Sequence, residues 1–562
     1  MATIKQIRRF RRRVIYTALA LLGLFFFFLI FADRFVEPIL RDRLHTLIVR
    51  GSDSLYTYEL GKLKANFFGG NVEVENLQVN IDSNHYHRLK RKGTLPSLTM
   101  QLDLKKGHIK GVSLVSLLFG KKIKVEEIMS KQADIKLSRH PVGKDITEET
   151  DEPLWKSLQP DITSIAVKRI RLDGVKLLYK NADTSESVKL QFDECFALFE
   201  DIRIDSAATV DTTRIGFTKN ISMRFHDLKF RTEDSTYKMK AEWITYSSKN
   251  RTFEVDSFKL QPTLEKEDYY KAFNKQKSLY YLEFVKVRFR NLRLDRFIHK
   301  DIIEADSAVF VTPNIKIYND RTALPDFESK IGNYPHQKLL AASAVIRVKH
   351  LSLTNAKMEY TERNAKNGQE GTVKLKDINL AANNITNDHE LIKINPVCVA
   401  NVQGLILNSS PMQVQFRFFL DSLNGRYDAH GWVKNISAAQ LNPLAVPLAN
   451  VQINSFDISQ LNFQVRGFDH EAWSNVQMPY RNLSLTIRKT DEETGETKTS
   501  RFLTKILNRF VIWPDNPGSD GQLRTANNSK VLRLTTQSFF GLLWKAIFSG
   551  MQDVMMKSGR YG

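Results

Sequence analysis

Cysteine is scarce in this chain, with 2 residues among 562. Cys195 and Cys398 lie far apart in the sequence and both are flanked by strand-like residues. Two buried free thiols and a single disulfide are therefore both compatible with the sequence. The count excludes a small secreted fold that several disulfides hold together.

Sequence motifs of common enzymes are missing as well. The chain contains no G-x-x-x-x-G-K-[ST], no G-x-S-x-G and no H-E-x-x-H. His85 and His87 would share one face of a strand, but they stand in the polar, basic stretch NHYHRLKRK, which is typical of a solvated loop. We predict a protein that is not an enzyme and has neither a cofactor nor a metal site.

Only one run is long and apolar enough to cross a membrane. Residues 14–32 (VIYTALALLGLFFFFLIFA) carry no charge, and as a helix they would be roughly 28 Å long. The basic segment 1–13 before them places the N-terminus in the cytoplasm. A cleaved signal peptide is the alternative, but the run exceeds the usual length and FADRF has no A-x-A site. We predict a single transmembrane helix, with the rest of the chain outside the cytoplasm.

Acidic residues are outnumbered, and the formal net charge is +21. Such an excess suits an anionic surface such as phospholipid headgroups, whereas no motif supports nucleic-acid binding. An ordinary solvated face is the other interpretation of the basic residues. The candidates for contact with a membrane surface are Arg88, Lys90, Arg91, Lys92, Lys121 and Lys122.

Alternation of apolar and polar residues is abundant and begins with NVEVENLQV (71–79), which predicts strands with one apolar face. The stretch IAVKRIRLDGVKLLYK (165–180) aligns without gaps on IRVKHLSLTNAKMEYT (346–361), and the apolar positions coincide. In both copies a two-residue break, at 173–174 and 354–355, predicts a hairpin. The candidate residues for the apolar face are Val72, Val74, Leu77, Val79, Ile165, Val167, Leu172, Val175, Leu177, Ile346, Val348 and Leu353.

A shorter pattern also recurs along the chain. Asn or Asp is followed by Leu or Ile, one further residue and another apolar residue, in NLQV (76–79), DLKF (227–230), NLRL (291–294), DINL (377–380) and NLSL (482–485). Any antiparallel β protein can yield such tetrapeptides. Together with the longer match, they favour one repetitive β array over several unrelated domains.

Helical patterns are few, which leaves the apolar face of the sheet without an obvious cover. We expect a helix or linker in 33–62, the β array in 63–490, a helix within 263–281, a loop-rich extension in 491–535 and an amphipathic helix in 536–557 with Ser538 as its N-cap. Such a sheet closes into a barrel, pairs into a sandwich or lines an apolar groove. The apolar face of the last helix comprises Phe540, Leu543, Trp544, Ile547 and Met551.

The order of these features resembles a known family. A basic N-terminal anchor followed by FFGGNVEVENLQV, then GWVKNISAAQLNPLAVPL (431–448), VQINSFDISQLNFQVRG (451–467) and NRFVIWPDNP (508–517), is similar to AsmA-like envelope proteins of the Bacteroidota type. That family is related to TamB, YhdP and the chorein-type bridge lipid transfer proteins. A glycine that members often carry near VQINSFDIS is replaced here by Ser455 and Phe456.

The resemblance implies a fold and a function. The expected fold is mainly β, with an N-terminal transmembrane helix, an elongated, twisted antiparallel β-groove, few helices and a C-terminal amphipathic helix. The expected location is the bacterial inner membrane, with most of the chain in the periplasm. There the groove would bind or conduct phospholipids in envelope and outer-membrane lipid homeostasis, with the outer membrane or an envelope protein as a further partner. The alternative is an anchored scaffold or outer-membrane assembly factor that binds protein.

Overall fold

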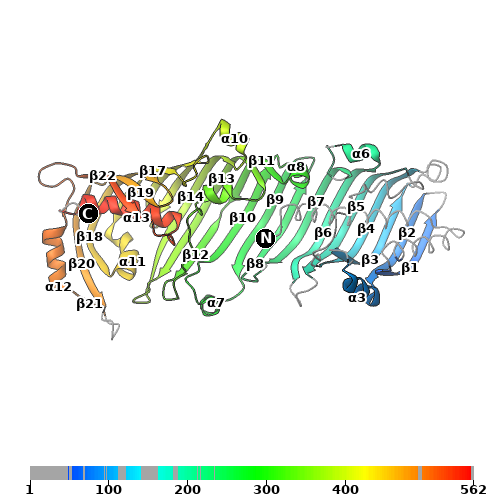
Figure 1. Cartoon of the computed structure of the whole chain (residues 1–562), viewed down its shortest axis with the longest axis horizontal. Coiled ribbons are helices and arrows are strands. Elements are labelled where there is room, and N and C mark those ends of the chain that lie inside the picture. Colours follow the sequence, from blue (N-terminus) through cyan, green and yellow to red (C-terminus); the bar gives the residue numbers. More distant parts are fainter. Residues whose placement is uncertain are drawn as a thin grey trace. The chain divides into compact units, whose positions relative to one another are not determined.

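The computed structural model confirms a mainly β protein (Figure 1). It describes residue 49 and residues 54–557, except 67–69, 94, 96–97, 112–121, 141–162, 182–187, 212, 216, 233 and 491–496. The chain divides into two compact units. The first comprises Met1–Phe258 and Arg290–Ile302, and the second Lys259–Phe289 and Ile303–Gly562.

The first unit consists mainly of β-strands, with a few short helices between them. Its elements are β1 (Tyr56–Asn66), β2 (Asn71–Ile81), α3 (Ser83–Lys92), β3 (Leu98–Lys110), β4 (Lys122–Arg139), β5 (Ser164–Asn181), β6 (Val188–Ile204), α6 (Ser206–Val210), β7 (Thr218–Arg231), β8 (Tyr237–Ser247), most of β9 (Thr252–Pro262) and α8 (Leu294–Lys300).

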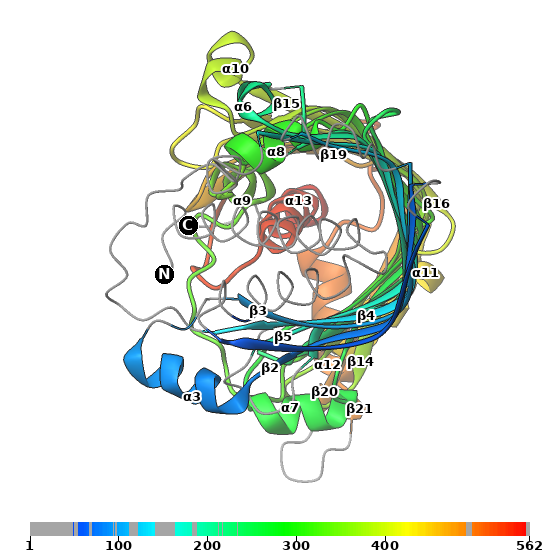
Figure 2. The same ribbon diagram turned by 90° about the vertical axis from the view of Figure 1, so that its right-hand side faces the viewer.

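Each strand from β1 to β7 pairs with the next one in the chain. All of these pairs are antiparallel except β4 with β5, which is parallel. A parallel pair needs a long connection, and here β4 ends at Arg139 while β5 begins at Ser164. Figure 2, which views this unit from its β1 edge, shows that the strands bend through a wide arc, so the sheet has a concave and a convex face.

The second unit has more helices. Its elements are α7 (Lys266–Phe273), β10 (Leu279–Arg290), β11 (Ile302–Val311), β12 (Asn314–Asp320), α9 (Pro335–Leu340), β13 (Val345–Arg363), β14 (Glu370–Thr386), α10 (His389–Ile394), β15 (Val397–Ile406), β16 (Ser410–Phe419), β17 (Tyr427–Ser437), α11 (Ala438–Ala449), β18 (Val451–Gly467), β19 (Glu471–Gln477), β20 (Tyr480–Thr490), β21 (Thr497–Thr499), α12 (Arg501–Ile506), the π-helix η2 (Leu507–Val511), β22 (Thr525–Leu532) and α13 (Phe539–Met555).

The sheet of the second unit forks near its C-terminal end. Strands β13 to β18 pair in chain order and antiparallel, while β12 and β13 are parallel. The first part of β18 pairs with β20 and its last part pairs with β19, which in turn pairs with β22. Most buried apolar residues of this unit form one core, which includes α13.

The sequence repeat is a repeat of topology, but the predicted hairpins are wrong. Residues 165–180 and 346–361 each lie within one continuous strand, β5 and β13. Each strand has a parallel neighbour before it and an antiparallel neighbour after it. The two-residue break is an irregularity inside the strand, because Gly174 and Asn355 adopt φ of +65° and +53° there and the chain continues in the same direction.

The short Asn/Asp pattern marks the same backbone feature. Its first residue has a left-handed backbone in all five copies, with φ between 52° and 58°. Asparagine and aspartate tolerate this region better than other residues with a side chain. These five residues are Asn76, Asp227, Asn291, Asp377 and Asn482.

Several segment boundaries differ from the predictions. The expected helix in 263–281 is confined to α7, and β10 already begins at Leu279. NHYHRLKRK is a helix rather than a loop, since the side chain of Asp82 caps α3 by accepting from the backbone N–H of His85. The segment 491–535 contains β21, α12, η2 and β22, and β1 begins at Tyr56, before residue 63. The C-terminal helix begins after Ser538, whose side chain is the N-cap as predicted.

The predicted membrane helix at residues 14–32 lies outside the described residues. Among the residues that the structure does describe, no helix is both long and apolar enough to cross a bilayer.

Candidate functional site

The apolar face of the first unit is the candidate site. Apolar side chains from β2 to β6 pack against one another there in a single cluster. The buried strand residues are Val74, Leu77, Val79, Leu104, Ile109, Ile123, Val125, Ile128, Ala133, Val167, Ile170, Val175, Phe192, Cys195, Ile202 and Ile204.

The left-handed residues keep these side chains on one face. Val74 and Leu77 are three positions apart, so strict alternation would point them to opposite faces. Both are nonetheless buried, with exposed fractions of 1% and 2%. Asn76 lies between them with φ of +54° and shifts the alternation by one residue.

The shift occurs at the same level in neighbouring strands. Gln132 in β4 and Gly174 in β5 have φ of +55° and +65°. Both lie between the paired residues Lys131–Asp173 and Ala133–Val175. Because the alternation of side chains shifts at the same level in both strands, the register between them is preserved. The apolar face therefore continues on both sides of Gln132 and Gly174.

Several side chains of the apolar face are only partly buried. Large side chains that pack against the cluster are only half-buried, among them Ile165, Leu172 and Leu177 from β5. Figure 1 shows α3 and α6 at the ends of the strands and not across them. Further half-buried members are Leu190, Phe199, Phe225, Leu228 and Ile244.

The predicted apolar residues fall into two separate groups. Those from β2 and β5 lie in the cluster of the first unit, except Val72, which pairs with Ile109 in β3 and whose side chain is not described. Ile346, Val348 and Leu353 belong to β13 in the second unit, where Leu353 packs against the large core, Val348 is buried and Ile346 is half-buried. The prediction missed β3, β4 and β6, whose alternation is visible in the sequence once phase shifts are allowed.

In the second unit, α13 covers part of the apolar face. Leu543, Ile547 and Met551 are buried in the core with β19 and β22. The helix lies close to the sheet: Ser474 Oγ donates to the carbonyl oxygen of Ala546 at 2.7 Å. Gly550 permits this approach, since a Cβ there would come within 2.4 Å of Val476 Cγ2.

The five residues predicted to form one apolar face of α13 lie on two different sides of the helix. Phe540 and Trp544 are 60% and 55% exposed, unlike the three buried members of the set. They point away from β19 and β22, and the Trp544 ring stacks on Phe548 with centroids 5.8 Å apart. The sequence pattern did not separate the two faces because the helix is apolar on nearly every side.

The predicted basic residues gather mainly on α3. Lys90, Arg91 and Lys92 form its last turn, where positive charge is favourable beside the C-terminal carbonyl groups. All three are exposed, whereas Arg88 is half-buried. Lys122 is exposed at the start of β4, and Lys121 lies outside the described residues.

The described residues offer little reactive chemistry. They contain no group of three or more His, Cys, Asp and Glu residues that could hold a metal ion. His85 accompanies the helix cap, with Nδ1 2.8 Å from Asp82 Oδ1. Both cysteines are free, and burial, with a smaller effect of Glu194, raises the pKa of Cys195 to about 12, so its thiol is protonated at neutral pH.

Comparison with known proteins gives no assignment: no protein-family model matches this chain, and no curated protein sequence matches it.

Proposed function

We propose that this chain binds or conducts phospholipids along the apolar face of its sheet. In this proposal residues 14–32 anchor it in the inner membrane of a bacterial envelope, and the two β units lie in the periplasm. The protein would serve envelope lipid homeostasis without catalysing a reaction.

One observation carries the proposal: the apolar face of the first unit combines a continuous buried strip with large, half-buried side chains. Soluble sheets usually cover such a face with a second layer. An acyl chain is a suitable cover, because moving one of sixteen carbons through water costs on the order of 12 kcal/mol at about 0.8 kcal/mol per CH₂. The exposed basic residues of α3 suit anionic headgroups.

The experiment is site-specific photo-crosslinking in cells that express the full chain and are labelled with radioactive phosphate. A benzophenone amino acid replaces Leu177, which is half-buried on the apolar face, or Lys176, which is its exposed neighbour on the other face. Phosphate-labelled adducts at position 177 and none at position 176 would support lipid binding. Unlabelled chain at both positions would contradict it.

A second candidate function is that of an envelope scaffold or outer-membrane assembly factor. It is favoured by α13, which covers the apolar face of β19 and β22 with the chain's own residues. Under this alternative, crosslinks from position 177 would join the chain to another protein and would carry no phosphate label.

A further inference from the structure

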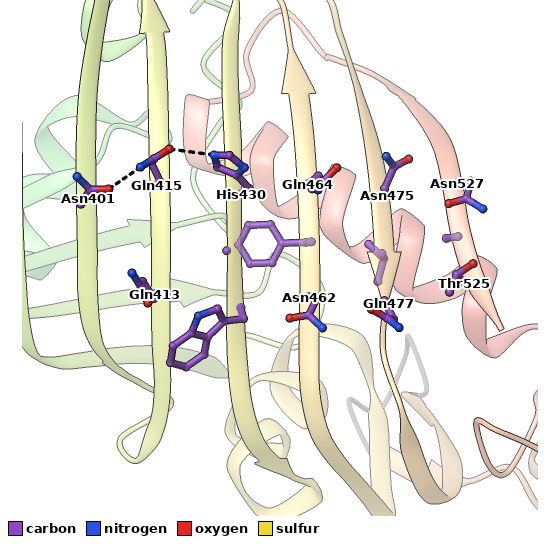
Figure 3. Close-up of a pocket in the computed structure, with 15 residues that line it drawn as sticks. Asn401, Gln413, Gln415, His430, Asn462, Gln464, Asn475, Gln477, Thr525 and Asn527 are labelled. Carbon is purple, nitrogen blue, oxygen red and sulfur yellow. Dashed lines mark hydrogen bonds between the residues drawn. The ribbon is translucent and has the colours of Figure 1, made fainter. Parts of the chain in front are cut away.

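The opposite face of the second unit carries a hollow of about 680 Å³ on its C-terminal strands (Figure 3). Two rows of side chains cross the sheet there, each row made of residues paired between neighbouring strands. The first row is Asn401, Gln415, His430, Gln464 and Asn475. The second row is Gln413, Trp432, Asn462, Gln477 and Thr525.

These rows face away from the core of the unit. Ser474 and Val476 in β19 are buried against α13, so Asn475 and Gln477, which alternate with them, point to the other side and are exposed. Figure 3 shows the labelled side chains in front of the strands and α13 behind them. The hollow is therefore separate from the apolar face of the sheet.

The lining of the hollow is uncharged, and an ammonium group lies at its edge, where Lys434 Nζ is 4.6 Å from the centroid of the Trp432 ring. None of the fifteen residues that line it is Asp, Glu, Lys or Arg. The chain as a whole has 83 basic and 62 acidic residues. A solvent-facing sheet surface usually carries such charges, which also discourage pairing with other chains.

The polar side chains are partly organised and partly available. Gln415 Nε2 donates to Asn401 Oδ1 at 2.9 Å, and Gln415 Oε1 lies 3.0 Å from His430 Nε2. These contacts orient three members of the first row. Within the described chain, the side chains of Gln413, Gln464 and Gln477 make no hydrogen bond, so their amides can each donate and accept.

We propose that this hollow binds an uncharged glycan chain. Sugar hydroxyl and acetamido groups both donate and accept hydrogen bonds, as the side-chain amides do. Lys434 Nζ lies over the Trp432 ring, and the part of the ring that this flexible side chain leaves uncovered offers an apolar surface for the C–H face of a sugar ring. The members of each row lie on successive strands about 4.8 Å apart, which gives an extended chain a series of equivalent contacts across the sheet.

The composition of the hollow disfavours other ligands. Nucleic acids and phospholipid headgroups are bound through Lys and Arg, which are absent from its lining. Protein interfaces have a core enriched in aromatic residues, Met and Arg, whereas the two rows here contain seven amides with one tryptophan, one histidine and one threonine.

The test measures binding of three oligosaccharides to the purified full chain by isothermal titration calorimetry. The probes are a hexamer of β-1,4-linked N-acetylglucosamine, a hexamer of β-1,4-linked glucose and an anionic hexamer of galacturonic acid. Binding of at least one neutral hexamer, with much weaker binding of the anionic one, is expected. Binding of neither neutral hexamer, or tighter binding of the anionic one, would overturn the proposal.

Variants then locate the site. Gln464→Glu keeps the shape of the side chain and removes its donor, and Trp432→Ala removes the apolar surface. Each should weaken neutral-glycan binding about tenfold or more, the scale of one or two lost contacts. Gln522→Glu is the matched control, because Gln522 is exposed and does not line the hollow. Equal affinity in all variants would place the glycan elsewhere and overturn the assignment. Thermal unfolding of each variant verifies that it is folded.

Discussion

Gly174 in β5 and Asn355 in β13 occupy the same position of the repeated sequence and share a left-handed backbone, with φ of +65° and +53°. Each ends one run of alternating apolar residues and begins another with shifted phase. In β5, Leu172 before Gly174 and Val175 after it belong to the same cluster. In β13, Leu353 and Ala356 likewise share one core.

We predict that Gly174→Ala destabilises the first unit by about 1–2 kcal/mol, because a side chain disfavours the left-handed backbone. The space itself is free, since the nearest atom to an added Cβ is Glu194 Oε1 at 3.9 Å. Gly174→Asn should cost less than Gly174→Ala, and Lys176→Ala is the control in the same strand. Hydrogen exchange of β5 in the full chain measures the effect locally, which suits a chain of two units. Equal protection of the β5 amides in Gly174→Ala and in the wild type would contradict the expected backbone strain at position 174.

The two sides of α13 should respond differently to truncation. Ile547→Ala removes a side chain that is 7% exposed in the core and should destabilise the second unit by about 2–5 kcal/mol. Phe548→Ala changes the next residue, which is 41% exposed, and should cost less than about 1 kcal/mol. Urea unfolding of the full chain, followed by hydrogen exchange of α13 and β19, measures both. A larger loss in Phe548→Ala would mean that its exposed side has a partner.

The stability of the second unit should fall in mild acid because of His336. This side chain is 3% exposed, and within the described chain neither ring nitrogen has a hydrogen-bond partner. Burial lowers its pKa from 6.5 to about 4, although Asp469 opposes the shift. Above pH 6.5 the ring is neutral in both states; as the pH falls from 6.5 towards 4, the unfolded chain takes up the proton and stability is lost, about 2 kcal/mol by pH 5.

The measurement for His336 is the free energy of unfolding at pH 7 and pH 5. His336→Phe, which cannot titrate, should lose less stability between the two pH values than the wild type. His470→Gln, a change at an exposed histidine, should keep the full pH dependence. An unchanged pH dependence in His336→Phe would assign the effect to other groups.

A carboxylate on the apolar face should block lipid contact. Leu177→Asp places a charge beside the half-buried side chains, where an acyl chain would have to pass, and desolvating that charge is costly. We expect the phosphate-labelled adduct at a benzophenone in position 190, another half-buried member of the cluster, to be strongly reduced. Lys176→Asp, on the exposed side, should leave the adduct unchanged. Equal loss in both variants would indicate a general effect of charge or folding.

Alternation made the β class, the apolar strands and the C-terminal helix predictable, including its N-cap at Ser538. These features depend on neighbours in sequence, which the chain itself displays. The interpretation of the breaks at 173–174 and 354–355 was wrong for the same reason. A Gly or Asn at φ above zero fits both a tight turn and an irregularity within a strand, and only pairing with the neighbouring strands decides between them.

The sequence by itself determined which residues are apolar, where their alternation changes phase and where a left-handed backbone is tolerated. Only the tertiary structure decided that left-handed residues of neighbouring strands, such as Gln132 and Gly174, lie at one level and preserve the register. It also decided that α13 is buried on one side and exposed on the other, and that uncharged residues from six strands form one hollow. Such features arise from contacts between residues distant in the chain, and local sequence preferences do not encode them.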